Sequence, residues 1–322
     1  MRRAIELAAQ VRSITSPNPW VGAVLVTSDG STFEGATEPP GARHAEIVAL
    51  DAAHAAGADV AGATMYTTLE PCSHHGRTPR CTDALIAVRV ARAVVGIEDP
   101  DTQVAGQGLE RLRAAGLTVD VEVCADAVRS QLAPYVKHRT TGRPWVLLKL
   151  AASLDGRTAA PDGSSQWITG PAARADTHRL RAESDAVIVG AGTVRTDDPA
   201  LTVRDADGDD PLRVVLGQAP EGARVHPCVE LNGNLPDVLD ELGRRGVVQA
   251  MVEGGATVAG AFHREGLVDQ YVLYLAPALF GGDDARPMFA GPGASTIDDV
   301  WRGRITNVEQ LGDDLKVELE AV

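Results

Sequence analysis

The chain has 322 residues, with 30 basic and 44 acidic side chains, and a formal net charge of −14. This length predicts two domains, each large enough to bury its own core. The acidic balance argues against a main role in holding nucleic acid, and no apolar run approaches the roughly 18 residues of a membrane span. Four cysteines in so long a chain do not form a disulfide framework, so we expect a reducing, cytoplasmic location.

The first half of the chain alternates between helical and extended patterns. Helices are expected at 3–12, 45–56, 82–88, 107–115 and 125–137, and strands at 20–27, 63–69, 92–97 and 117–123. This alternation predicts a central sheet with helices on both faces. The polar segment 138–144 contains glycine and proline and is the expected linker between two domains, 1–141 and 145–322.

The second half carries another α/β pattern. Strands are expected at 145–153, 186–192, 212–216, 247–255, 268–279, 304–311 and 314–322, and helices at 172–182, 236–245 and 256–265. The segment 190–199 is interpreted as a glycine-rich turn that carries a hydroxyl group and paired carboxylates. Both halves are therefore expected to be α/β domains.

A metal-site motif gives the strongest chemical signal. His44-Ala45-Glu46 is followed by Pro71-Cys72 and then by Cys81. One imidazole and two thiolates suit zinc, and three protein ligands leave a fourth position for a water molecule that ionises near neutral pH. Glu46 is placed to move protons without coordinating, as in the zinc nucleobase deaminases with their H-x-E…P-C-x-x-C signature. We therefore predict a catalytic zinc site, although the two cysteines here are nine residues apart.

A structural zinc site is the alternative reading of the same motif. His74 or His75 could supply a fourth ligand and close the site to water. The other histidines lack such spacing and are interpreted as surface or core residues.

A glycine pair gives a weaker signal in the second half. Glu253-Gly254-Gly255-Ala256-Thr257 ends a buried strand and begins a helix, where free backbone N–H groups could bind a cofactor phosphate. A glycine pair of this kind is more often only a structural strand-to-helix turn. No G-x-G-x-x-G follows the first strand of this half, so the standard dinucleotide fingerprint is absent.

Longer strings show a family resemblance over nearly the whole chain. They are SPNP (16–19), HAE (44–46), LEPCSHHGRTPRC (69–81), EDPD (98–101), LKLAASLDGRTA (148–159), SSQWITGP (164–171), HRLRAESDAVIVGAGTVRTDDPALTVR (178–204), VEGGATVAGAF (252–262) and APALFGG (276–282). In this order they resemble the bifunctional RibD family of riboflavin biosynthesis, which joins a pyrimidine deaminase to a ribose reductase. The resemblance implies a cytidine-deaminase-like α/β/α sandwich followed by a dihydrofolate-reductase-like α/β domain.

For the first domain, the resemblance implies hydrolytic deamination of a diaminopyrimidinone that carries a ribose 5-phosphate. His44, Cys72 and Cys81 would hold Zn²⁺, with Glu46 as the proton shuttle. Asn18 would orient the substrate beside the metal. The substrate's phosphate or ribose would be bound by Arg77 and Thr78, in the loop between the cysteines.

For the second domain, the resemblance implies reduction of the opened ribose by NADPH. The cofactor would be bound by Ala151, Trp167, Thr193, Asp197, Gly254, Gly255, Ala256 and Thr257. The substrate would be held by Ser165, Arg181, Leu201, Arg204 and Glu253. Lys149 and Asp155 are expected near this site.

Two rival functions remain at this stage. The chain could be a nucleic-acid-editing deaminase, which the −14 charge and the lack of a basic, aromatic-rich stripe count against. Alternatively, the second domain could be a non-catalytic scaffold, because residues 217–235 form a short segment for this family. We expect a small phosphorylated substrate, no nucleic-acid or membrane partner and, by family analogy, a homo-oligomer.

Overall fold

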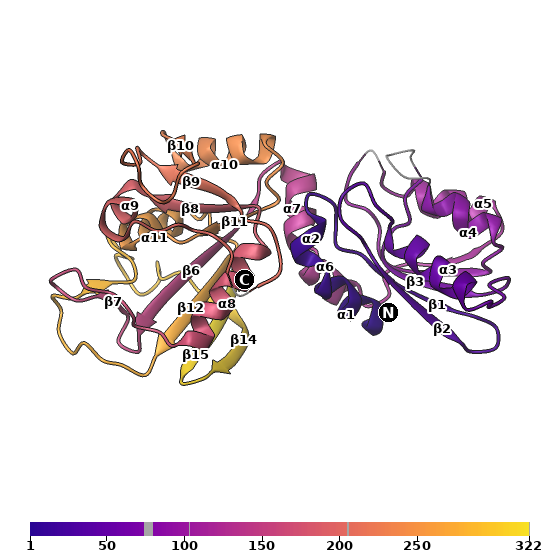
Figure 1. Cartoon of the computed structure of the whole chain (residues 1–322), viewed down its shortest axis with the longest axis horizontal. Coiled ribbons are helices and arrows are strands. Elements are labelled where there is room, and N and C mark those ends of the chain that lie inside the picture. Colours follow the sequence, from indigo (N-terminus) through magenta and orange to yellow (C-terminus); the bar gives the residue numbers. More distant parts are fainter. Residues whose placement is uncertain (74–79, 103, 205, 322) are drawn as a thin grey trace. The chain divides into compact units, whose positions relative to one another are not determined.

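Two separate sheets organise the chain, one in the unit Met1–Gly142 and one in the unit Arg143–Val322 (Figure 1). The computed structural model describes residues 1–73, 80–102, 104–204 and 206–321. Each sheet is covered by helices. The expectation that both halves have an α/β fold is therefore confirmed.

The first unit is built on a five-stranded sheet with the order β2-β1-β3-β4-β5. Its strands are β1 (Gly22–Val26), β2 (Thr32–Ala36), β3 (Thr64–Leu69), β4 (Arg92–Ile97) and β5 (Thr118–Asp120). Strand β1 is antiparallel to both neighbours, whereas β3, β4 and β5 are parallel. The parallel strands therefore end at one edge, where Cys72 follows β3 and Asp99 follows β4.

Helices cover both faces of this sheet. They are α1 (Arg2–Gln10), α2 (Arg12–Thr15), α3 (Ala45–Ala55), α4 (Cys81–Ala87), α5 (Gln107–Ala114), α6 (Ala125–Gln131) and α7 (Ala133–Thr141). Helices α1 and α6 pack on one face, and α3, α4 and α5 on the other (Figure 1). Helix α3 approaches β2 so closely that a Cβ atom on Gly35 would lie 2.1 Å from the carbonyl oxygen of Ala45. Glycine is therefore required at this crossing.

The second unit contains an eight-stranded sheet with the order β10-β9-β8-β11-β6-β12-β15-β14. Its strands are β6 (Trp145–Ser153), β8 (Ala186–Gly190), β9 (Leu212–Leu216), β10 (Val229–Leu231), β11 (Gln249–Val252), β12 (Gln270–Ala276), β14 (Gly303–Leu311) and β15 (Asp314–Ala321). The first six in this order are parallel, and the last two are antiparallel. Strands β7 (Arg157–Ala159) and β13 (Arg286–Pro287) pair antiparallel in a separate two-stranded sheet.

Two apolar clusters sandwich the second sheet. Helices α10 (Leu235–Arg244) and α11 (Ala256–Arg264) pack on one face, with Leu242 and Phe262 fully buried. Helices α8 (Pro171–Ala182) and α9 (Ala191–Asp197) pack on the other face, through Leu180 and Val194. Alternate residues of β6 supply both clusters, since successive side chains of a strand point to opposite faces.

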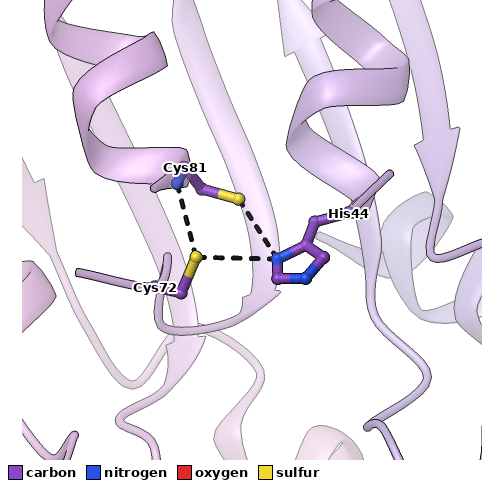
Figure 2. A group of neighbouring side chains, drawn as sticks. All are labelled: His44, Cys72 and Cys81. Carbon is purple, nitrogen blue, oxygen red and sulfur yellow. Dashed lines mark hydrogen bonds between the residues drawn. The ribbon is translucent and has the colours of Figure 1, made fainter. Parts of the chain in front are cut away.

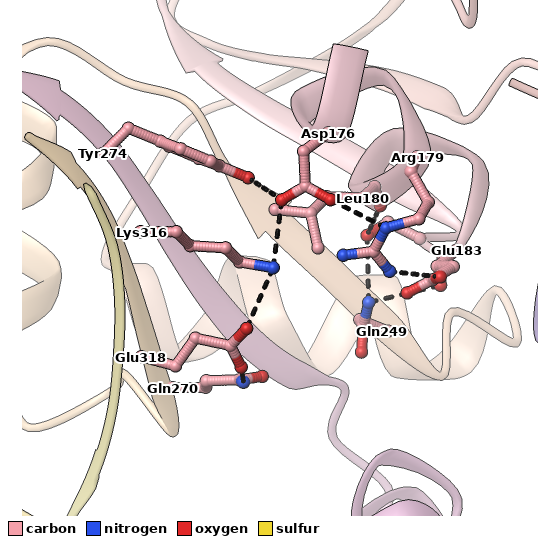
Figure 3. Close-up of polar contacts among 10 residues, drawn as sticks. Asp176, Arg179, Leu180, Glu183, Gln249, Gln270, Tyr274, Lys316 and Glu318 are labelled. Atoms are coloured by element: carbon pink, nitrogen blue, oxygen red, sulfur yellow. Dashed lines mark hydrogen bonds and ion pairs between the residues drawn. The ribbon is translucent and has the colours of Figure 1, made fainter. Parts of the chain in front are cut away.

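A polar network also fixes α8 to the sheet (Figure 3). The Tyr274 hydroxyl donates to Asp176 Oδ2 at 2.6 Å, and Lys316 Nζ lies 2.9 Å from the same oxygen. Lys316 Nζ also lies 2.9 Å from Glu318 Oε1, and its side chain is only 4% exposed. These contacts from β12 and β15 set the position of the helix that carries His178 and Arg181.

The structure corrects three expectations about secondary structure. The expected linker, 138–144, contains the boundary between the two units, but its first four residues belong to α7, which ends at Gly142 in a left-handed conformation. The expected helix 125–137 is two helices separated at Leu132, with Pro134 in the first turn of the second. The expected turn at 190–199 contains α9, so the strand before it ends at Gly190.

Strands β2, β7, β10 and β13 were not expected from the sequence. Three of them have only two or three residues, so they lack a repeating pattern that could identify a strand. In β2, no alternation of apolar and polar residues is present, since two of its five residues are exposed and a glycine is the one buried residue.

Candidate functional site: a metal centre and a second cavity

The three proposed metal ligands converge in the first unit (Figure 2). His44 immediately precedes α3, Cys72 lies just beyond β3, and Cys81 is the first residue of α4. Their ligand atoms all lie within 4.8 Å of one another. His44 Nδ1 is 3.6 Å from Cys72 Sγ and 3.4 Å from Cys81 Sγ.

This donor set fits zinc in both chemistry and spacing. Zinc bonds of about 2.3 Å to sulfur and about 2.0 Å to nitrogen, at tetrahedral angles, place the donor atoms about 3.5 Å apart. The measured N–S distances match that value. The backbone N–H of Cys81 donates to Cys72 Sγ at 3.3 Å. Contact between the two thiols lowers the pKa of Cys72 to about 4 and raises the pKa of Cys81, so Cys72 carries the thiolate and Cys81 keeps its proton until a metal binds.

Glu46 lies in the first turn of α3, two residues after His44. Its residue surface is only 3% exposed. Burial, and then the negative charge of Cys72, raise the pKa of Glu46 to about 7. A carboxyl group with such a pKa can both accept and donate a proton near neutral pH.

A cavity of about 530 Å³ opens beside the triad. Its lining includes Asn18, His44, Glu46 and Cys72, as the sequence analysis expected for the site around the metal. Arg77 and Thr78 lie outside the described residues.

Further charged or polar residues line this cavity and were not singled out from the sequence; they include Asp99, Asp101, Tyr135 and Arg139. The Tyr135 hydroxyl donates to Asp99 at 3.3 Å, and the Arg139 guanidinium lies 5.1 Å from the centre of the Tyr135 ring. The EDPD string at 98–101 was the one available signal for the two aspartates. No sequence signal indicated Tyr135 and Arg139, because their helix, α7, reaches the cavity only in the folded structure.

Glu70 supports the loop that borders this cavity. It is 4% exposed and accepts backbone N–H bonds from Asp99 at 3.1 Å and Gly108 at 2.7 Å, and further bonds from Gly106 and Leu109. A Cβ atom on Gly108 would lie 2.1 Å from the carbonyl oxygen of Pro71. The carboxylate and this close approach together hold the residues directly before Cys72.

The second unit has its own cavity of about 680 Å³. Most of the residues predicted for cofactor and substrate line it: Ala151, Ser165, Trp167, Arg181, Thr193, Asp197, Leu201, Arg204, Glu253, Gly254, Gly255 and Ala256. Thr257 is exposed at the start of α11 and is not part of the lining. Asp155 is not part of it either, because its carboxylate binds the Ser153 hydroxyl and the backbone N–H of Gly281.

Arg181 and Glu253 form an ion pair in this cavity. Arg181 donates twice to the carboxylate, with one N–O distance of 2.9 Å, and the two side chains are 12% and 9% exposed. Burial alone would raise the pKa of Glu253, but the charge and hydrogen bonds of Arg181, together with the charges of Lys149 and His178, outweigh it and the pKa falls. The glutamate is therefore an anion, and its partner's charge is already compensated within the protein.

Further basic groups surround this ion pair. Lys149, which is expected near this site, lines the cavity, and its Nζ lies 5.7 Å from the centre of the Tyr274 ring. Burial lowers the pKa of Lys149. One Arg204 nitrogen lies 3.4 Å from His178 Nε2, and burial likewise lowers the pKa of this imidazole.

An aromatic side chain and the glycine pair line the rest of the cavity. Trp167 is 68% exposed, and the Arg174 guanidinium, which donates to the carbonyl of Thr169, lies 4.6 Å from its ring centre. The backbone N–H of Gly255 donates to Thr193 Oγ1 at 3.3 Å. A Cβ atom on Gly254 would lie 2.5 Å from Val258, so the chain requires glycine there. A small-residue turn at a helix start suits a nucleotide diphosphate.

In the described part of the chain, every helix is too short or too polar to cross a lipid bilayer.

Comparison with known proteins covers both units. Residues 1–97 match the cytidine and deoxycytidylate deaminase zinc-binding region, and residues 144–317 match the RibD C-terminal domain. The RibD of Mycobacterium tuberculosis is 45% identical over 100% of this chain and 96% of that protein. The RibD of Escherichia coli K12 is 38% identical over 99% of this chain and 98% of that protein.

Solved structures agree with these sequence matches. Acinetobacter baumannii RibD aligns with a TM-score of 0.92 and 38% identity, over 100% of this chain and 97% of that one. A diaminohydroxyphosphoribosylaminopyrimidine deaminase/5-amino-6-(5-phosphoribosylamino)uracil reductase from Thermotoga maritima aligns with a TM-score of 0.90 and 34% identity, with the same coverage. The expected fold, a cytidine-deaminase-like unit followed by a reductase unit, is confirmed. The chain belongs to the RibD family of bifunctional zinc deaminases and NADPH-dependent reductases of riboflavin biosynthesis.

Proposed function

We propose that the two units catalyse consecutive reactions. The first unit hydrolyses the 2-amino group of 2,5-diamino-6-ribosylamino-4(3H)-pyrimidinone 5′-phosphate and releases ammonia. The second unit then reduces the ribose to a ribityl chain, which gives 5-amino-6-ribitylamino-uracil 5′-phosphate. The observation that carries the proposal is the convergence of His44, Cys72 and Cys81 beside a buried Glu46.

In the first unit, each residue around the metal has a separate role in deamination. Zinc, when bound, supplies a Lewis acid that lowers the pKa of water to near neutrality. Glu46 takes the proton of the attacking water and passes it to the leaving amino group, because its carboxyl group is buried beside the ligands. Asn18 lines the same cavity and orients the pyrimidine. We assign the substrate's phosphate or ribose to Arg77 and Thr78.

In the second unit, one group of residues holds the substrate. NADPH supplies the hydride, and the protein supplies orientation and a dry cavity. Arg204 and the Arg181–Glu253 pair bind the phosphate and hydroxyl groups of the substrate, with Ser165 and the backbone at Leu201.

A second group of residues holds the cofactor. Gly254, Gly255 and Ala256 bind its diphosphate, and Thr193 supports this turn through Gly255. The remaining cofactor contacts are assigned to Ala151, Trp167 and Asp197, which line the cavity, and to Thr257.

Charge, cysteine chemistry and exposed apolar residues support the proposed substrate class, location and oligomeric state. The net charge of −14 supports a small-molecule substrate over nucleic acid. Free cysteines that serve as metal ligands support a reducing, cytoplasmic location. Ile305, Val308 and Leu315 are 57%, 56% and 39% exposed on the last two strands, and this apolar exposure supports a homo-oligomer.

One experiment tests both activities. Purified protein is assayed for zinc content, for ammonia release from the diaminopyrimidinone phosphate and for NADPH oxidation with the deaminated product. We expect one zinc per chain and both turnovers, with chelation abolishing only ammonia release. Zinc without NADPH oxidation would favour a scaffold role for the second unit. Retention of tRNA in a gel shift, with no turnover of the small substrate, would favour a nucleic-acid-editing deaminase.

A further inference from the structure

His178 is a buried histidine of the second cavity to which the proposed reaction gives no role. It lies on α8, lines the cavity and is 8% exposed. Burial, followed by the charges of Arg181 and Arg204, lowers the pKa of His178, so its ring is uncharged near neutral pH. A neutral imidazole has one N–H donor and one acceptor nitrogen, and each needs a partner when the ring is buried.

Both ring nitrogens have their partners in residues 201–204, a segment that is neither helix nor strand. Nδ1 lies 3.1 Å from the carbonyl oxygen of Thr202 and 3.1 Å from the backbone nitrogen of Arg204. Nε2 lies 3.4 Å from a guanidinium nitrogen of Arg204. Arg181, three residues after His178, donates to the same Thr202 carbonyl at 3.1 Å. Two side chains on one face of α8 therefore hold this irregular segment.

The contacts of His178 assign the hydrogen to one of its two ring nitrogens. A guanidinium can only donate a hydrogen bond, and a carbonyl oxygen can only accept one. With the hydrogen on Nδ1, the ring donates to Thr202 and accepts from the Arg204 side chain at Nε2. With the hydrogen on Nε2, this N–H would face the N–H groups of the guanidinium. The Nδ1–H form satisfies both contacts, so His178 presents an acceptor to Arg204.

Arg204 and Arg181 differ in how their charges are compensated. Arg181 donates twice to Glu253, so its charge is paired inside the protein. Among the described residues, the Arg204 guanidinium has a single hydrogen-bond partner, the uncharged His178, and Arg204 is exposed. The charge of Arg204 and its other N–H donors are therefore available to an anion in the cavity.

We propose that His178 is a positioning residue, which holds the Arg204 guanidinium in the orientation that binds the phosphate group of the reductase substrate. The inference rests on the proposed reductase function. An arginine side chain on an irregular segment has many rotamers, and a ligand that must select one of them binds more weakly. The contact with Nε2 fixes the guanidinium through one N–H and leaves others for two oxygens of one phosphate.

Two substitutions at His178 separate this role from a structural one. In His178→Asn the amide takes the place of Nδ1 and can bond to Thr202, whereas in His178→Gln it takes the place of Nε2 and can accept from Arg204. In the full-length, zinc-loaded protein, His178→Asn should raise the KM for the deaminated, phosphorylated substrate about 5- to 20-fold at constant kcat. The inhibition constant of inorganic phosphate for NADPH oxidation should rise in the same proportion. His178→Gln should stay within about twofold of the wild type.

A substrate without its phosphate and a second histidine variant supply the matched controls. Because the phosphate contact is absent, the wild type and His178→Asn should reduce the dephosphorylated substrate with equal kcat/KM. His263→Asn removes another hydrogen-bonded histidine, on α11 of the same unit and outside the cavity lining, whose Nδ1 lies 2.7 Å from the Tyr271 hydroxyl. This variant should leave all of these kinetic constants unchanged.

The outcomes separate the inference from the proposed function. Equal losses in His178→Asn and His178→Gln, or an equal loss with the dephosphorylated substrate, would show that His178 only supports the fold. An unchanged KM in His178→Asn would show that Arg204 needs no positioning. Each of these results overturns the inference and leaves the reductase function intact. Wild-type protein that oxidises no NADPH with the phosphorylated substrate would refute both.

Discussion

The two cavities carry opposite balances of charge. The cavity beside the metal is lined by four carboxylates, Glu46, Glu70, Asp99 and Asp101, with Arg139 as its one arginine among the described residues. The cavity of the second unit is lined by four arginines and a lysine, against three carboxylates, Asp197, Asp198 and Glu253. An acidic protein therefore concentrates its basic groups where it binds anions, and keeps carboxylates where a proton must move beside a cation.

The two cavities also differ in how the chain assembles them. The metal ligands and Glu46 come from the segment 44–81, at the starts of two helices and the end of one strand. The second cavity draws on residues from Lys149 to Ala256, which meet along the edge of a parallel sheet. Substitutions at the first cavity should therefore change activity with little effect on stability, whereas substitutions at the second should change both.

Glu46→Gln should have the largest effect, confined to one activity. The amide keeps the shape of the side chain but cannot carry a proton between water and amine, so deamination should fall by about 10²- to 10⁴-fold. Metal analysis and ammonia release measure the two properties separately. Bound zinc should remain, because His44, Cys72 and Cys81 are untouched.

NADPH oxidation is the internal control for this variant. It should match the wild-type rate, since the second cavity is lined entirely by residues of the second unit. Deamination above a tenth of the wild-type rate would remove Glu46 from the proton path.

Arg181→Ala should impair reduction and also destabilise the second unit. Breaking a buried ion pair leaves Glu253 uncompensated, at a cost of about 3–5 kcal/mol in the free energy of unfolding. The kcat/KM for the substrate should fall about 30-fold or more, because we also assign this arginine to substrate binding. Steady-state kinetics and denaturant unfolding measure the two effects.

A paired variant separates folding from function at this position. Arg181→Met with Glu253→Gln removes both charges, so stability should largely recover while reduction stays impaired. If ammonia release fell as much as reduction in Arg181→Ala, the defect would be one of folding rather than of binding.

The contrast between the cavities also explains what the sequence could predict. His44, Glu46 and the two cysteines were identified because ligand spacing in a short segment is a local property. Asp99 and Tyr135 reach the same cavity only after the parallel strands align, which no spacing reveals.

Local composition misled the prediction at two other positions. Helix α9 contains Gly192 and the β-branched Thr193 and Val194, which are poor helix formers, and burial of Val194 in the core stabilises it. Residues 138–141 of the expected linker are helical, because polar side chains are tolerated in the exposed last turn of α7. There, Thr141 Oγ1 donates to the carbonyl of Lys137.

Gly108→Ala tests how far the metal centre depends on its surroundings. The added Cβ would meet the Pro71 carbonyl oxygen at 2.1 Å, so the backbone before Cys72 must shift. We expect a loss of about 1–3 kcal/mol in stability, as for other overpacked sites, and weaker zinc retention in a competition assay with a chelator. Gly293→Ala, whose Cβ would meet no atom within 4 Å, should change neither property. Unaltered zinc retention in Gly108→Ala would show that the ligand loop tolerates displacement.

Lys316→Met should have the smallest effect and should be confined to the second unit. Asp176 loses one of its partners but keeps the Tyr274 hydroxyl and Arg179, so the cost should be about 1–3 kcal/mol in the free energy of unfolding. Because the network sets the position of α8, the KM for the reductase substrate should also rise modestly, while deamination is unchanged. The matched control is Lys137→Met in the first unit, which should leave reduction as it was. If Lys316→Met lowered stability without any change in that KM, the network would hold the core together but would not set the position of the substrate-binding helix.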